Sequence, residues 1–161
     1  MTDAQKQFID KAAAAASQAT HPFPAMAACE AALESGYGLS GLASEDNNLF
    51  GMKQHRHPLY GTVSLPTREF EAGEWVTVTA DWVKYPDWPT CFFDRLNTLT
   101  KLSAAYPHYA AALAADDPIT FVREVSQTWS TDPARADKVL AIYQAYMAFS
   151  AIQTAAPQGA D

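Results

Sequence analysis

Glu34 is a carboxylate placed where an alanine-rich helical run has to end. It lies in residues 31–38 (AALESGYG), and the two glycines behind it are typical of a helix terminus. The last turn of a helix carries partial negative charge, which disfavours an ionised carboxylate there. A general acid must hold a proton until the reaction needs it, so this position favours such a role. Taken by position alone, Glu34 is more often explained as an exposed residue on the helix surface.

A second carboxylate is the usual partner of such an acid. Hydrolysis of a glycosidic bond, for example, commonly uses an acid and a base or nucleophile on opposite sides of the bond. Glu69, in residues 67–70 (TREF), is the candidate because it falls in a predicted hairpin that can face Glu34 across a cleft. Glu71 and Glu74 compete with it, and hairpin glutamates are usually solvated, so the sequence leaves this choice open.

Amides and aromatic rings are the side chains that could form the walls of such a cleft. Residues 46–53 (DNNLFGMK) place Asn47, Asn48 and Phe50 around a glycine. Adjacent asparagines are often only turn residues, but their amides can also hold a loop beside the helix end or bind sugar hydroxyls. Large aromatic side chains are more often part of the core than of a groove. Those that could line the groove are Trp82, Tyr85, Trp88 and Trp129.

Helical periodicity predicts most of the elements that must position these groups. Residues 3–18 form a first helix with one apolar face, and Pro24 suits the first turn of a second helix that ends at residues 35–38. After Pro89 the pattern predicts helices over 91–105, 118–129 and 133 to about 154, with a short turn over 109–113. Two Asp-Pro pairs, at 117–118 and 132–133, look like helix starts. The expected apolar face of the first helix consists of Phe8, Ile9, Ala12, Ala13 and Ala16.

Between residues 47 and 85, Gly, Pro and Asn punctuate two segments that favour strands, 62–65 and 75–79. These predict a short antiparallel hairpin that turns near residues 71–74. The expected fold class is therefore mainly α (α+β), a helical body with a small antiparallel β-hairpin lobe that forms a substrate cleft. A chain of 161 residues suits a single domain, which we expect over residues 1–154 with a flexible tail over 155–161.

Composition argues against several kinds of partner. Eighteen acidic and eleven basic residues give a formal charge of −7 at pH 7, which repels phosphate backbones, so we expect no nucleic acid. The chain lacks the pattern of a signal peptide, and no stretch approaches the roughly 20 apolar residues of a membrane span, so we expect no membrane insertion. Cys29 and Cys91 are expected to be buried thiols. No Cys/His spacing suits zinc, and we expect no metal and no other cofactor.

Several of these segments together resemble the bacterial glucosaminidase family, glycoside hydrolase family 73. That family includes the flagellar peptidoglycan hydrolase domain, autolysins and phage lysins. The joint match in order and spacing, over roughly residues 5–148, is more specific than any one segment and favours a catalytic role for Glu34. The segments that carry it are 32–38 (ALESGYG), 40–43 (SGLA), 47–53 (NNLFGMK), 67–70 (TREF), 82–85 (WVKY) and 129–138 (WSTDPARADK).

The resemblance implies a lysozyme-like fold and an endo-β-N-acetylglucosaminidase that cleaves the β-1,4 bond after N-acetylglucosamine in peptidoglycan. It gives Glu34 the role of general acid and Glu69 that of second catalytic carboxylate. This second residue would activate water, stabilise the transition state or yield to the acetamido group of the substrate. The substrate-binding residues expected on this basis are Tyr37, Asn47, Asn48, Phe50, Tyr85, Trp88 and Trp129.

Two departures from the family pattern affect substrate contacts more than the reaction. Trp129 stands where tyrosine is common and so lacks a phenolic hydroxyl, and Val83 stands where arginine is common. Muramidase or lytic transglycosylase-like cleavage and a non-catalytic glycan-binding module are the alternatives. The expected partner is the glycan strand of peptidoglycan, bound by a monomer. We expect a protein made in the cytoplasm that acts on the cell wall after phage-type or specialised release.

Overall fold

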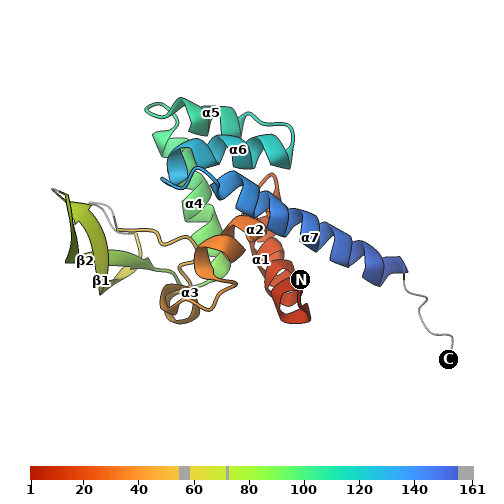
Figure 1. The fold of residues 1–161 in the computed structure, drawn as a ribbon, viewed down its shortest axis with the longest axis horizontal. Coiled ribbons are helices and arrows are strands. Elements are labelled where there is room, and N and C mark those ends of the chain that lie inside the picture. The colour runs from red at the N-terminus through yellow and green to blue at the C-terminus, as the bar shows by residue number, and fades with distance from the viewer. Residues whose placement is uncertain (55–58, 72, 156–161) are drawn as a thin grey trace.

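The computed structural model describes residues 1–54, 59–71 and 73–155, and only the backbone of residues 68–71, 75 and 153–155. A group of helices forms the body, and a two-stranded antiparallel hairpin projects from one side of it (Figure 1). This arrangement confirms the expected fold class. The elements in chain order are α1 (Asp3–Gln18), α2 (Pro24–Ser35), α3 (Gly41–Asp46), β1 (Gly61–Glu71), β2 (Glu74–Lys84), α4 (Trp88–Leu102), α5 (Pro107–Leu113), α6 (Pro118–Trp129) and α7 (Arg135–Ala155).

The core begins where α1 packs against α2. A capping box between Thr2 and Gln5 starts α1, and Pro24 occupies the first turn of α2 as expected. The predicted apolar face of α1 is buried except at Ala13, which is only partly covered, and Ala15 is buried instead. Because both helices carry many alanines, they bury a face composed largely of small side chains. Cys29 and Cys91 are buried free thiols, as expected.

The hairpin is antiparallel and turns between Glu71 and Glu74, as predicted. β1 pairs antiparallel with β2 from Gly61 opposite Lys84 to Glu71 opposite Glu74, so both strands are longer than the predicted segments. The structure adds α3, a six-residue helix capped by Ser40 that the periodicity analysis did not predict. Such a helix has fewer than two turns and leaves no apolar repeat to detect.

The C-terminal helices differ from their predicted bounds at several ends: α4 ends at 102 rather than 105, and the predicted turn at 109–113 is the helix α5. α4 begins at 88 rather than 91 because the side chain of Asp87 accepts a hydrogen bond from the backbone N–H of Thr90. The Asp117-Pro118 pair starts α6 as predicted. The start predicted at Asp132-Pro133 was wrong, because Asp132 forms a turn with Ala134 and α7 begins only at 135.

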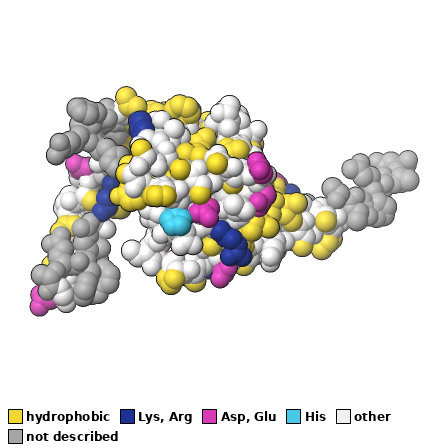
Figure 2. Space-filling model, turned by 90° about the horizontal axis from the view of Figure 1, so that it is seen from above, with side chains coloured by type: hydrophobic (Ala, Val, Ile, Leu, Met, Phe, Trp, Pro, Cys, Tyr) yellow, Lys and Arg dark blue, Asp and Glu magenta, His cyan; other side chains and the backbone are white. Residues whose placement is uncertain are grey.

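The last helix, α7, runs across the body, and its C-terminal part extends beyond it (Figure 1). Residue 155 still belongs to α7, and residues 156–161 of the expected tail lie outside the described residues. Among the described helices, none has the length and apolar character needed to cross a bilayer. On the face seen in Figure 2, the visible Lys and Arg side chains are separated by uncharged and acidic surface.

Candidate active site

Glu34 lies in the last turn of α2, one residue before the helix ends. Gly36 caps α2 in the left-handed conformation, with φ of 60°, and its backbone N–H donates to the carbonyl of Ala32. The hydroxyl of Ser35 donates to Ala31 O over 2.6 Å and accepts from the backbone N–H of Gly38 over 2.8 Å. These contacts fix the end of the helix and therefore the position from which the Glu34 side chain leaves the body.

A cleft of about 360 Å³ opens beside Glu34. Its volume falls within the roughly 300–1,000 Å³ typical of small-molecule sites. Phe50 and Trp129, both predicted as substrate-binding residues, lie in this cleft with Glu34. Its complete lining is Glu34, Phe50, Gly51, Met52, Lys53, Thr98, Leu102, Tyr109, Trp129 and Ser130. The cleft thus combines one carboxylate, one ammonium group and several aromatic or apolar walls.

A second hollow, of about 680 Å³, lies along the loop between α6 and α7. It shares Trp129 and Ser130 with the first, so the two hollows adjoin at these residues. The loop is shaped by Asp132, whose carboxylate accepts from the backbone N–H of Ala134 and pairs with Lys138 over 2.6 Å. Together the hollows offer an extended surface rather than a closed cavity.

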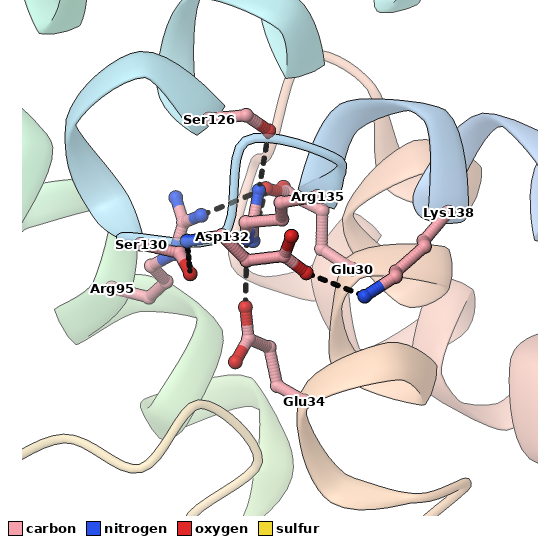
Figure 3. A network of polar contacts seen from close by, with 8 residues as sticks. All are labelled: Glu30, Glu34, Arg95, Ser126, Ser130, Asp132, Arg135 and Lys138. Carbon is pink, nitrogen blue, oxygen red and sulfur yellow. Dashed lines mark hydrogen bonds and ion pairs between the residues drawn. The ribbon is translucent and has the colours of Figure 1, made fainter.

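Glu34 contacts a group of ionic side chains of which three are buried; we call Glu30, Glu34, Arg95 and Arg135 together the charge cluster (Figure 3). Glu30 lies one helical turn before Glu34 on α2, so both side chains leave the same face of the helix. Oε1 of Glu30 accepts hydrogen bonds from Nη2 of Arg95 and Nη2 of Arg135, each over 2.9 Å. Nε of Arg135 donates to Oε1 of Glu34 over 2.8 Å.

The buried members of the charge cluster stay ionised because they face one another. Burial by itself would raise the pKa of Glu30, but Arg95 and Arg135 hold this pKa below its usual value. Burial lowers the pKa of the Arg95 guanidinium, and Glu30 opposes the change. Burial would also lower the pKa of Arg135, yet Glu30 and Glu34 raise it above its usual value. The buried charges of Glu30, Arg95 and Arg135 therefore lie next to Glu34.

Arg95 also connects the charge cluster to the walls of the cleft. Its guanidinium carbon lies 4.1 Å from the ring centroid of Trp129 and 5.0 Å from that of Phe50. Both distances are within the range of cation–π contacts. The guanidinium of Arg95 thus contacts the rings of Phe50 and Trp129 as well as the carboxylate of Glu30, and it fixes these three groups relative to one another.

The second predicted carboxylate, Glu69, lies on β1 with its backbone opposite Val76 of β2. Its side chain is outside the described residues, as is that of the competitor Glu71. The other competitor, Glu74, begins β2 and is exposed. The assignment of the second carboxylate to Glu69 stays a prediction.

The side chains of the two predicted asparagines form hydrogen bonds with backbone groups and do not line the cleft. Asn48 is buried, and its side chain hydrogen-bonds to Met52 and Val83. Asn47 caps α3 in the left-handed conformation and donates from its amide to the carbonyl oxygens of Tyr85 and, more weakly, Pro86. These contacts position the loop from which Phe50 enters the cleft.

The remaining predicted binding residues lie outside the lining of the cleft. Tyr85 is buried, and its hydroxyl donates to Asp94 over 2.6 Å; burial, followed by this hydrogen bond, raises the pKa of its phenol well above the usual value. Tyr37 and Trp88 both pack against Phe8 of α1. In this structure their rings support the body behind the site.

Sequence analysis missed Glu30, Arg95 and Arg135. Glu30 carries a local signal, because it precedes Glu34 by four residues and so lies on the same face of a predicted helix. Arg135 lies inside the segment 129–138 that carried the family resemblance. Nothing in this segment indicates that its side chain would contact α2. Arg95 offers no signal in the sequence, because only packing between α4 and α2 brings it to Glu30.

Comparison with known proteins agrees with this arrangement. The glucosaminidase family, described as mannosyl-glycoprotein endo-beta-N-acetylglucosaminidase, matches residues 10–148 of the chain. Exo-glucosaminidase LytG of Bacillus subtilis is 31% identical over 153 residues, covering 89% of this chain and 52% of the relative. Peptidoglycan hydrolase FlgJ of Vibrio parahaemolyticus is 31% identical over 147 residues, covering 88% of this chain and 45% of the relative. The chain therefore spans about half the length of these relatives.

The fold has a counterpart among solved structures. The C-terminally truncated glycoside hydrolase domain of Salmonella typhimurium FlgJ superposes with a TM-score of 0.70 at 25% identity, covering 89% of this chain and 98% of that domain. The family match extends over most of the chain and includes Glu34, the hairpin and Arg135. This confirms the resemblance inferred from the sequence segments, and the chain belongs to the glucosaminidase family.

Proposed function

We propose that this protein is a peptidoglycan hydrolase that cleaves the β-1,4 glycosidic bond after N-acetylglucosamine within glycan strands. The observation that carries the proposal is the position of Glu34, a partly exposed carboxylate at a helix end that enters a cleft with aromatic walls. Sugars are commonly held by aromatic faces and polar groups. The names of the relatives, a glucosaminidase and a peptidoglycan hydrolase, support the same reaction class.

In this mechanism the protonated carboxyl of Glu34 donates its proton to the glycosidic oxygen as the C1–O bond breaks. Water then adds to C1 and loses a proton, so that the products are two shorter glycan ends and Glu34 regains its proton. Glu69 is proposed as the second carboxylate. The neighbouring hollow along the α6–α7 loop supports a substrate that extends beyond one sugar ring, and Trp129 lies where the two hollows adjoin.

We further propose that the protein acts on the cell wall, outside the cytoplasmic membrane, because that is where its substrate lies. A monomer suffices for this reaction, since Glu34 and the cleft belong to one chain. The cleft residues Phe50 and Trp129 are proposed to contact the substrate directly. Tyr37, Asn47, Asn48, Tyr85 and Trp88 are proposed to support the cleft.

The test is digestion of purified peptidoglycan by the wild type and by Glu34→Gln, which keeps the shape of the side chain but removes the acid. We expect turbidity to fall and muropeptides with N-acetylglucosamine at the reducing end to appear with the wild type. Loss of general acid catalysis should lower the rate by about 10²- to 10⁴-fold. The matched control is Glu45→Gln, because Glu45 is an exposed residue of α3 and should retain full activity.

The products distinguish the alternatives. Ends with N-acetylmuramic acid would indicate a muramidase, and 1,6-anhydro ends a lytic transglycosylase. Release of single sugars from chain ends would indicate an exo-enzyme. Binding to peptidoglycan without any release would contradict the proposal and favour a glycan-binding module. Full activity of Glu34→Gln would show that Glu34 is not the general acid.

A further inference from the structure

Trp129 is the aromatic residue at which the two hollows of the site adjoin, because its side chain lines both of them. It is the last residue of α6, and the backbone of the next residue, Ser130, is already extended, with φ of −140° and ψ of 151°. The side chain is only partly buried. The helix therefore fixes where the indole begins, and contacts of the side chain fix how its ring is turned.

Arg95 of α4 covers one face of this ring. Its guanidinium carbon lies 4.1 Å from the ring centroid of Trp129. Carbon atoms in contact lie about 3.5–4.0 Å apart, so an approach to the edge of the ring would leave a longer distance to the centroid. The planar guanidinium therefore lies over the face of the indole, as in other arginine–aromatic stacks. Because Arg95 is 2% exposed, water hardly screens this contact.

Arg95 lies behind the wall of the cleft rather than in it. It is not one of the described residues that line the two hollows. Its Nη2 donates instead to Oε1 of Glu30 on α2 over 2.9 Å (Figure 3). The guanidinium is thus anchored to the helical body on one side and stacked on Trp129 on another. A ligand in the cleft meets the indole and not the cation.

The hydrogen bonds of Arg95 do not by themselves explain an arginine at this position. Its Nε is buried and has no hydrogen-bond partner among the described residues. A buried donor without a partner costs free energy, and this cost calls for a compensating contact. The stack on Trp129 is such a contact, because it needs a planar cation and lysine or methionine cannot reproduce it.

Phe50, the other aromatic wall beside Arg95, depends less on this cation. The guanidinium carbon lies 5.0 Å from the ring centroid of Phe50. Phe50 is itself buried, and its ring packs edge to face against Phe92 with the centroids 5.4 Å apart. Phe50 would keep this second support without Arg95. Trp129 is therefore the wall whose orientation depends most on the cation.

We propose that Arg95 is a positioning residue that holds the indole of Trp129 as a fixed wall for a sugar ring where the two hollows adjoin. The inference rests on the proposed function, which makes a glycan strand the ligand of the cleft. A ring already held in its binding orientation loses less conformational freedom when the sugar packs on it, so the affinity rises. Arg95 thereby strengthens binding of the glycan without touching it.

The experiment is a double-mutant cycle on binding, in which every variant also carries Glu34→Gln so that the ligand is not consumed. The probe is the soluble tetrasaccharide of alternating N-acetylglucosamine and N-acetylmuramic acid, and its Kd is measured by isothermal titration calorimetry. Arg95→Met replaces the guanidinium by an apolar chain of similar length. It should raise Kd about five- to tenfold when Trp129 is present and less than about twofold in the Trp129→Leu background.

Two further variants separate the stack from charge and from folding. Arg95→Lys keeps a positive charge near Glu30 but loses the planar stack, so it should raise Kd about two- to fivefold, again only when Trp129 is present. The same cycle is run with Arg95→Lys if Arg95→Met does not fold. Arg123→Met is the matched control, because Arg123 is an exposed arginine on the same helix as Trp129, and it should leave Kd unchanged.

The ring itself is followed by ¹⁹F NMR of protein labelled with 5-fluorotryptophan, with Trp129→Leu used for assignment. We expect one sharp resonance of Trp129 with Arg95 intact and a shifted or broadened resonance in both Arg95 variants. An unmoved resonance in both variants, or an equal loss of affinity with and without Trp129, would overturn the inference. If the tetrasaccharide does not bind while Arg95 is intact, the proposed function fails. The resonance of Trp129 alone then decides whether Arg95 positions the ring.

Discussion

Replacing Asn48 by alanine tests how the wall of the cleft is held in place. Asn48 is 1% exposed, and its side chain makes three hydrogen bonds with backbone groups. Its amide nitrogen donates to Met52 O over 3.0 Å and to Val83 O over 2.9 Å, and its amide oxygen accepts from Met52 N over 2.9 Å. Alanine removes all three and leaves the backbone groups of Met52 and Val83 without these partners.

The magnitude follows from these contacts. Each hydrogen bond contributes about 1 kcal/mol net, so the loss of three lowers the free energy of unfolding by about 3 kcal/mol. The neighbouring Asn47 provides the control, because its amide makes two longer bonds, of 3.1 and 3.4 Å, near the surface. It also adopts φ of 54°, which glycine accepts without strain. Asn47→Gly should therefore cost about 1 kcal/mol or less.

The assay is urea unfolding followed by far-ultraviolet circular dichroism, with equal m-values required for the comparison. In Asn48→Ala the loop that carries Phe50 loses the side-chain hydrogen bond from Asn48 to Val83 of β2, so KM for peptidoglycan should rise in the folded variant as well. A loss below about 1 kcal/mol for Asn48→Ala, or a loss equal to that of Asn47→Gly, would refute the argument.

Two further predictions concern the body behind the site. Gly38→Ala should cost about 2–4 kcal/mol, because φ is +79° and the new Cβ would lie 2.7 Å from a ring carbon of Phe8. Gly36→Ala, with φ of +60° and open space around the Cβ, should cost only about 1–2 kcal/mol; similar losses measured by thermal unfolding would contradict the clash. Burial lowers the pKa of His21 from 6.5 to about 4, so between these pH values the unfolded chain binds the extra proton. The free energy of unfolding should therefore fall by up to about 3 kcal/mol as the pH drops through this window. His21→Asn should flatten that slope in urea unfolding, and an unchanged slope would show that His21 is not its source.

Local signals in the sequence were enough to predict most of the elements and the end of α2. Proline at a first helical turn, aspartate at an N-cap, glycine after the last turn and alternating strand residues act within a few positions of the chain. They predicted α1, α2 and α6 with nearly correct bounds, and they predicted the hairpin with strands that are too short. They failed for α3, which is too short for a repeat, and for the start of α7, where the capping aspartate forms a separate turn.

The same signals were weaker for individual site residues. The sequence singled out Glu34, Phe50 and Trp129, which the structure brings to one cleft. The sequence could not distinguish an asparagine whose side chain faces a groove from one whose side chain hydrogen-bonds to the backbone, because the amide group suits both roles. Asn48 is buried against β2, and Tyr85 is buried against Asp94. Which side of a loop faces solvent depends on the packing of distant segments.

The sequence by itself determined the family, the helix end that presents Glu34 and the hairpin beside it, because these depend on local patterns and on their order. Only the tertiary structure decided what surrounds Glu34. Arg135 is 101 positions away from Glu34, and Arg95 is 65 positions away from Glu30. A charge acts over a few ångströms in space whatever its separation along the chain. The packing of α4 and α7 against α2 therefore sets the electrostatic environment of Glu34.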